Sequence, residues 1–265
     1  MVRASPIARV VLGVLSVAAA GCGETTFSIP TVPTGVLTLF GRSVDGSYVA
    51  RPEGLFAQAS RAPAADSRST VDTCQLGDYV PQSTNISIVQ MEAGDSIVFS
   101  AGPDTAVLRP VRRFGITVYV AEPPDVAVVP GTEVSFTVSG AAGGFPAMAI
   151  SSLTPAALTA ITPISSRPPL DQPLPVAWEP VGDDSSRIEV LLIYATQGAI
   201  AFDEQVVCDW RDDGAGVIRP ELLGGWVGSE LQRIEVSRYR TQRREMGDTV
   251  LFLLATFDTV PPVAP

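Results

Sequence analysis

The sequence predicts an all-β protein made of two β-sandwich domains in tandem. Short runs rich in β-branched and aromatic residues recur along the chain, and turn-forming residues separate them. The 265 residues include 23 glycines and 23 prolines, which suits many short strands joined by tight turns. No run of ten or more residues has the apolar spacing of an amphipathic helix. The chain is long enough for a core in each of two domains.

Residues 1–21 have the pattern of an export signal. Arg3 and Arg9 give a positively charged start. The apolar run 10–20 that follows is too short to span a bilayer as a stable helix. We therefore expect this segment to be removed on export.

The stretch AAGC, which ends at Cys22, resembles the lipobox of bacterial lipoproteins. The usual pattern has Leu three residues before the cysteine, where this chain has Ala19. The resemblance implies that Cys22 is lipidated and that several acyl chains anchor the protein to a membrane. It also implies that Gly23 permits sorting to the outer membrane in a cell with two membranes. The alternative is an ordinary signal peptide followed by an incidental cysteine.

The segment 22–35 is polar and proline-containing, and we expect it to form a tether. The first sandwich is expected over 36–165. Its strands are predicted at 36–40, 48–50, 55–59, 86–91, 96–100, 116–120 and 134–138. Turns between them are predicted at the Asp-Gly pair 45–46, the Ala-Gly-Asp stretch 93–95, the Gly-Pro pair 102–103 and the Pro-Gly pair 130–131. Residues 60–73 are expected to form an exposed loop. The glycine-rich stretch 140–146 is a corner between strands or a loop that approaches a ligand.

The proline-rich stretch 165–175 predicts the domain boundary, and the second sandwich is expected over 166–265. Trp178 closes its first strand and is expected in the core. The strand 187–195 is apolar on both faces, which predicts a central strand. Further elements are expected as strands at 199–202, 205–210, 233–239 and 249–257, a hairpin turn at 212–214 and a helical turn at 220–223.

About seven short strands with an early Trp178 resemble immunoglobulin-like or fibronectin-like sandwiches. The resemblance covers the last third of the chain and implies an immunoglobulin-like C-terminal domain. The chain departs from the antibody pattern, because this domain contains Cys208 alone. The motif VAWEP followed by VVCDWRDDGAGVIRPELL is also similar to uncharacterised exported lipoproteins of high-GC bacteria.

The composition excludes several kinds of chemistry. The chain has no histidine, and all 18 basic residues are arginines. Ser-His-Asp triads, histidine-ligated zinc, lysine phosphate loops and Schiff bases are therefore excluded. The net charge of −10 argues against a nucleic-acid partner. Carboxylate-dependent glycoside hydrolysis and calcium binding stay possible. No cofactor is expected.

Cys74 and Cys208 are the cysteines that remain besides Cys22. An exported compartment is oxidising, so we expect a disulfide between them. On the predicted boundaries this bond would tie the first domain to the second. The alternative is two separate buried thiols.

Asp209, Asp212 and Asp213 are the best candidates for metal ligands. Calcium takes oxygen ligands from turn regions such as the one that ends at Gly214. The spacing departs from the helix-loop-helix calcium motif, and a plain hairpin turn explains the same residues. The densest basic cluster is expected to be a solvated strand edge. The alternative is a contact for lipid head groups or for an acidic partner surface. The cluster comprises Arg238, Arg240, Arg243 and Arg244.

Together these features predict a membrane-anchored exported lipoprotein that is a non-catalytic structural or binding module of the cell envelope. Its expected partners are the membrane, through Cys22, and a protein or glycan at the cell surface. The alternative is a carbohydrate-binding or carboxylate-dependent carbohydrate-active protein. Exposed rings of Trp210 and Trp226 would favour sugar binding, whereas buried rings would favour the structural function.

Overall fold

The computed structural model describes residues 32–59, 71–79, 89–113, 115–158, 160–162, 164–165, 167–259 and 263–264. The predicted export signal, the predicted lipidation site Cys22 and the predicted loop residues 60–70 lie outside this part of the chain. So do residues 86–88 of a predicted strand. The described chain is all-β, as the sequence predicted.

The contacts divide the chain into two compact units. Unit 1 takes its residues from Met1–Ser67, Asn85–Thr154 and Thr241–Ala255. Unit 2 takes its residues from Arg68–Thr84, Pro155–Arg240 and Thr256–Pro265. The sequence predicted one boundary near residue 165, whereas each unit combines three separate segments.

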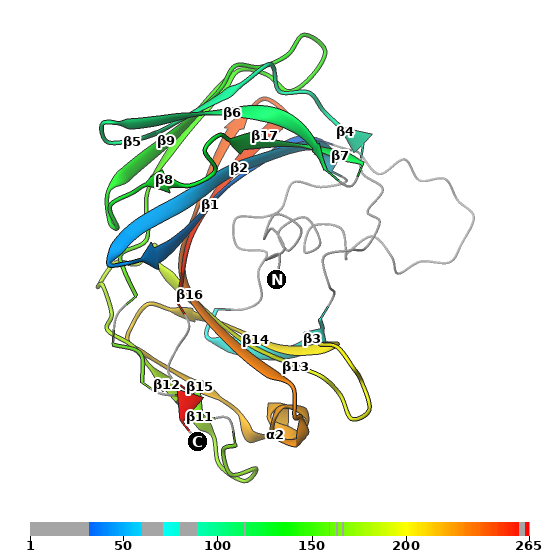
Figure 1. Ribbon diagram of the computed structural model, residues 1–265, viewed down its shortest axis with the longest axis vertical. Coiled ribbons are helices and arrows are strands. Elements are labelled where there is room, and N and C mark those ends of the chain that lie inside the picture. Colours follow the sequence, from blue (N-terminus) through cyan, green and yellow to red (C-terminus); the bar gives the residue numbers. More distant parts are fainter. Residues whose placement is uncertain are drawn as a thin grey trace, which may run out of the picture. The chain divides into compact units, whose positions relative to one another are not determined.

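Unit 1 is a ladder of hydrogen-bonded strands in the order β10-β9-β5-β6-β7-β2-β1-β17, and β4 and β8 also pair with β2 (Figure 1). The pairs from β10 to β1 are antiparallel. The strands are β1 Val32–Val44, β2 Ser47–Ala59, β4 Val89–Gln90, β5 Ile97–Ala101, β6 Asp104–Arg113, β7 Ile116–Ala121, β8 Val126–Ala127, β9 Glu133–Val138, β10 Met148–Leu153 and β17 Thr249–Thr259. The last four residues of β17 belong to unit 2.

The β1–β2 hairpin closes through a two-residue turn. Asp45 and Gly46 both have positive φ, 51° and 80°, as a type I′ turn requires. The predicted turn at this position is therefore confirmed. Both strands are longer than predicted, and β1 begins at Val32, which pairs with Ala59. Residues 32–35, assigned to the tether from sequence, are thus part of a strand.

Aromatic rings form much of the unit 1 core. The ring of Phe56 lies 4.7 Å from that of Phe145 and 5.4 Å from that of Tyr119. Phe99 and Phe136 face each other at 4.9 Å across β5 and β9. The rings on strands are buried because alternate residues of each strand point to the same side, and Phe145 is buried in the segment between β9 and β10.

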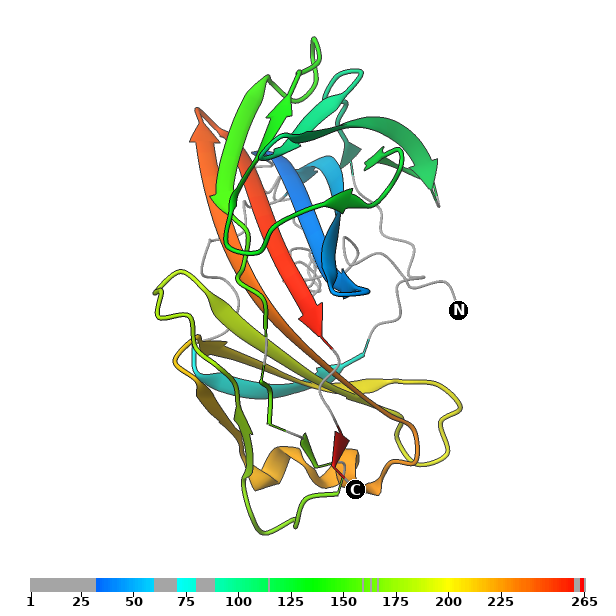
Figure 2. The same cartoon turned by 60° about the vertical axis from the view of Figure 1, so that its left-hand side comes forward.

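Unit 2 contains the hydrogen-bonded strands β16-β13-β14-β3 of the larger sheet and the two-stranded sheets β12-β15 and β11-β18. The larger sheet and the pair β12–β15 both contribute to one hydrophobic core. The pair β12–β15 and the helix α2 lie on the same face of the larger sheet (Figures 1 and 2). The elements are β3 Thr73–Asp78, β11 Ile164–Ser165, β12 Leu174–Ala177, β13 Arg187–Tyr194, β14 Glu204–Arg211, β15 Ala215–Ile218, η2 Pro220–Leu222, α2 Gly224–Gly228, β16 Gln232–Met246 and β18 Val263–Ala264. The last six residues of β16 belong to unit 1.

Three local predictions for unit 2 are tested directly. The strand β13 pairs with β14 on one side and β16 on the other, so it is central as predicted. The predicted helical turn is confirmed by η2, which begins with Pro220. The predicted strand 199–202 is wrong, because these residues are irregular, with bends at Ile200 and Ala201, and β14 begins only at Glu204.

The predicted hairpin turn at 212–214 is also wrong. It joins β14 to β15, but β15 pairs with β12 in the other sheet. Gly214 has φ of 103°, and its carbonyl accepts a 3.0 Å hydrogen bond from the backbone N–H of Trp178. A Cβ on Gly216 would lie 2.4 Å from the Trp210 ring. The turn therefore moves the chain between sheets, and glycine lets β15 approach that ring.

Candidate functional site

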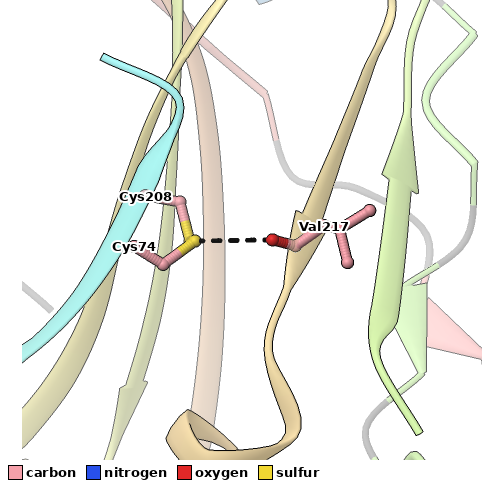
Figure 3. Close-up of a disulfide and its surroundings, with 3 residues drawn as sticks. All are labelled: Cys74, Cys208 and Val217. Atoms are coloured by element: carbon pink, nitrogen blue, oxygen red, sulfur yellow. Dashed lines mark hydrogen bonds between the residues drawn. A yellow bond between two sulfur atoms is a disulfide. The ribbon is translucent and has the colours of Figure 1, made fainter. Parts of the chain in front are cut away.

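A disulfide joins Cys74 on β3 to Cys208 on β14, with an S–S distance of 2.06 Å (Figure 3). The two residues are direct partners in the antiparallel register. Cys208 is fully buried, and the sulfur of Cys74 lies 3.9 Å from the carbonyl oxygen of Val217 on β15. The predicted bond is present.

The expectation that this bond ties the two domains together is wrong. Both cysteines belong to unit 2, because residues 71–79, which carry Cys74, belong to that unit rather than to unit 1. Beside the bond, the guanidinium of Arg211 forms an ion pair with Asp72. Strand β3 is thus attached to β14 by backbone pairing, a covalent bond and a charged pair.

The three acids predicted as calcium ligands do not form a metal site. The phenol of Tyr239 donates a 2.8 Å hydrogen bond to Asp209. Trp178 Nε1–H donates a 2.8 Å bond to Asp212, while Asp213 is exposed. Among the described residues, no group of three or more acidic or cysteine side chains is arranged to hold a metal ion. The calcium assignment is therefore wrong.

Asp212 instead belongs to a buried ion pair. Its carboxylate lies 2.8 Å from Nε of Arg238, and the two side chains are 0% and 1% exposed. The guanidinium also donates to the carbonyls of Ala157 and Glu179, at 2.8 and 2.5 Å. Buried charges need this degree of compensation. Arg238 is thus a structural residue of the unit 2 interior, and its assignment to a solvated strand edge is wrong.

The rest of the predicted basic cluster makes contacts within the chain. Arg240 is mostly buried and forms an ion pair with Asp183. The guanidinium of Arg243 lies over the ring of Phe252, 5.6 Å from its centroid. Arg244 donates a 2.7 Å hydrogen bond to a backbone carbonyl of the edge strand β10. This last bond occupies an acceptor on a sheet edge.

All three tryptophan rings are buried in unit 2. Trp178, Trp210 and Trp226 are 5%, 3% and 0% exposed. The first two stack, with centroids 5.8 Å apart and planes at 14°. The rings therefore form core rather than an exposed aromatic strip, and the core position predicted for Trp178 is confirmed.

A cavity of about 730 Å³ in unit 1 is the best candidate for a binding site. It lies between the segment before β5, the strands β6 and β7, and the segment after β9. Its volume falls within the usual range of small-molecule sites. The polar side chains around it are Glu92, Asp95, Ser96, Arg112, Thr117, Tyr119 and Ser139.

Tyr119 fixes one wall of this cavity. Its hydroxyl accepts a 2.9 Å hydrogen bond from the N–H of Ala93 and donates a 2.8 Å bond to the carbonyl of Gly94. Desolvation raises the pKa of the Tyr119 phenol, and the negative charges of Glu92 and Asp95 raise it further. The hydroxyl thus stays neutral and holds in place the loop that carries the two carboxylates.

The glycine-rich stretch 140–146 is a packed corner, one of the two alternatives from sequence. Phe145 is fully buried, and its N–H donates to the carbonyl of Glu92 at 2.7 Å. A Cβ on Gly94 would meet Ser139 Oγ at 2.3 Å, and one on Gly140 would meet a backbone nitrogen at 2.4 Å. The corner therefore builds the second wall of the cavity through close backbone contact.

The charged side chains around the cavity differ from other charged side chains of unit 1 in whether they have a charged partner. Asp125 forms ion pairs with both Arg42 and Arg51. Within the described ranges, no ion pair or side-chain hydrogen bond engages Glu92, Asp95 or Arg112. All three side chains are exposed.

The sequence predictions did not include this cavity, although one local signal was available. The Ala-Gly-Asp turn before β5 and the glycine-rich stretch were both recognised as turns. Their meeting depends on the pairing of β5 with β9, which joins positions about 40 residues apart. The strand β6, which carries Arg112, was not predicted, because Pro110 and its charged residues are unusual in a strand.

No protein-family model matches the chain, and no curated protein sequence matches it. Of the helices in the described residues, none is both long enough and apolar enough to cross a membrane.

Proposed function

We propose that this chain is an exported protein, anchored to the cell envelope by lipid on Cys22, whose folded part is a non-catalytic binding module. The disulfide between Cys74 and Cys208 is the observation that carries the export part of the proposal. Such bonds form and persist in oxidising compartments and are rare in the reducing cytosol. The lipobox-like stretch that ends at Cys22 supports anchoring.

The hydrogen bonds and ion pairs of the buried polar groups support a non-catalytic function. Asp209 and Asp212 are held by hydrogen bonds or an ion pair within unit 2. The Tyr194 hydroxyl donates to Glu204 at 2.6 Å, and its pKa is raised by burial and by that carboxylate. Groups occupied in this way stabilise the fold and are not poised to transfer protons.

The tryptophan positions weigh against the carbohydrate alternative. Sugar-binding sites commonly use exposed aromatic faces, and the rings of Trp178, Trp210 and Trp226 are all buried. The lining of the unit 1 cavity includes three charged side chains and several hydroxyls. These features favour a small charged or polar ligand.

We also propose that unit 2 is an immunoglobulin-like sandwich. The packing of β12 and β15 against the larger sheet supports this architecture. One feature departs from the antibody pattern, in which the disulfide joins opposite sheets. Here Cys74 and Cys208 are neighbours within one sheet.

The anchor is tested by replacing Cys22 with Ser and fractionating cells that express each form. The wild type should enter the membrane fraction and incorporate a labelled fatty acid, whereas Cys22→Ser should do neither. A Ser16→Ala variant, changed within the export signal but outside the lipobox-like stretch, serves as the matched control. An unlipidated wild type, or a Cys22→Ser protein that stays membrane-bound, would overturn the anchor assignment.

A further inference from the structure

We propose that the unit 1 cavity binds a small amphoteric molecule with an excess of positive charge, of the size of a diamino acid. This inference rests on the proposed binding function and names its ligand class. Glu92 and Asp95 would receive the ammonium groups, and Arg112 would receive the carboxylate. The net lining charge of these three side chains is −1, which such a ligand complements.

The strand register separates the two kinds of charge. Pro110 is the partner of Tyr119, and Arg112 is the partner of Thr117. Tyr119 is bonded to the loop that carries both carboxylates. Arg112 lies two residues farther along β6, which is about 7 Å at the usual rise of a strand. An extended diamino acid has charged groups separated by distances of this order.

The carboxylates and the guanidinium are available for a ligand. Within the described part of the chain they form no ion pair with one another or with other side chains. The charges of Glu92 and Asp95 nevertheless act on the cavity, because they raise the pKa of the Tyr119 phenol at its wall. A cation entering the cavity would experience the same negative potential.

The walls are formed before a ligand arrives. Gly94 and Gly140 bring two backbone segments together too closely for any larger residue. Ser139 Oγ–H donates a 2.8 Å hydrogen bond to the carbonyl of Ser96, which ties the end of β9 to the start of β5. A site with fixed walls loses less conformational entropy on binding. The hydroxyls of Ser96 and Thr117, which also line the cavity, add neutral donors and acceptors.

Calorimetric titration of the full chain in detergent, at low ionic strength, tests this proposal with two probes. L-Lysine carries both kinds of charge, whereas cadaverine is the same diamine without the carboxylate. We expect saturable binding of L-lysine. The variant Arg112→Gln should weaken lysine binding by about tenfold or more, as expected for loss of a charged hydrogen bond. It should leave cadaverine binding unchanged or stronger.

A Glu92→Gln, Asp95→Asn double variant should weaken both probes. The matched control is Arg109→Gln, because Arg109 is exposed on the same strand but does not line the cavity. Absence of lysine binding, or equal effects of Arg112→Gln and Arg109→Gln, would overturn the proposal. Equal weakening of lysine and cadaverine by Arg112→Gln would also overturn it. These outcomes are separate from the Cys22 fractionation, which tests the anchor alone.

Discussion

The Arg238–Asp212 pair offers the most direct test of how unit 2 is stabilised. The variant Arg238→Met keeps a similar side-chain volume and removes the charge. It leaves the Asp212 carboxylate fully buried without its cation, and it removes the donor to two backbone carbonyls. Breaking one side of a buried ion pair costs about 3–5 kcal/mol. We therefore expect a loss of unfolding free energy in that range.

Urea unfolding followed by tryptophan fluorescence measures this loss, because all three tryptophans lie in unit 2. With a typical urea m-value, the midpoint should fall by roughly 1–3 M. The control Arg219→Met removes an exposed ion pair with Glu221 and should cost less than about 1 kcal/mol. The double variant Arg238→Met, Asp212→Leu should recover part of the loss, since it leaves no isolated buried charge. Equal losses for Arg238→Met and Arg219→Met would refute this reasoning.

Two further predictions concern the disulfide and acid stability. Replacing Cys74 and Cys208 with Ala should lower the unfolding free energy by about 5 kcal/mol in the chain-entropy model, because the bond spans 134 residues. Thermal unfolding without reductant measures this loss of stability. An unchanged unfolding midpoint would contradict the prediction. Partial burial tends to raise the pKa of Asp183, but hydrogen bonds from Ser185, Arg240 and Ser186 outweigh it and lower the pKa well below 3.8. The stability from Asp183 is thus present above about pH 4 and is lost as pH falls toward the folded pKa. Asp183→Asn should flatten the acid limb of the stability profile, and an unchanged limb would refute the assignment.

Several features could be predicted because their causes are local. The Asp45–Gly46 turn depends on two adjacent residues that tolerate positive φ. The central position of β13 follows from apolar residues on both of its faces. Proline at the start of η2 marks its first turn. Each signal lies within a few residues of the structure that it determines.

Other features were missed because they depend on distant pairing. Strand β3 has a sequence with little β-preference, and it is a strand because it pairs with β14 and is bonded to it through Cys74. Strand β15 leaves the sheet of β14 for that of β12, which the Asp-Gly turn alone does not reveal. The buried ion pair of Arg238 was missed for the same reason, because its partner Asp212 lies 26 residues away in the chain.

The sequence by itself determined the all-β class, the Asp45–Gly46 turn and the central strand β13, and it indicated Cys74 and Cys208 as the candidates for the disulfide. It also excluded histidine- and lysine-dependent chemistry. Only the tertiary structure decided that residues 71–79 belong to unit 2 and that Asp212 forms a buried ion pair with Arg238. The tertiary structure also decided that Arg112, Glu92 and Asp95 line one cavity. The physical reason is that strand pairing joins residues remote in sequence, and a local pattern carries no information about the partner strand.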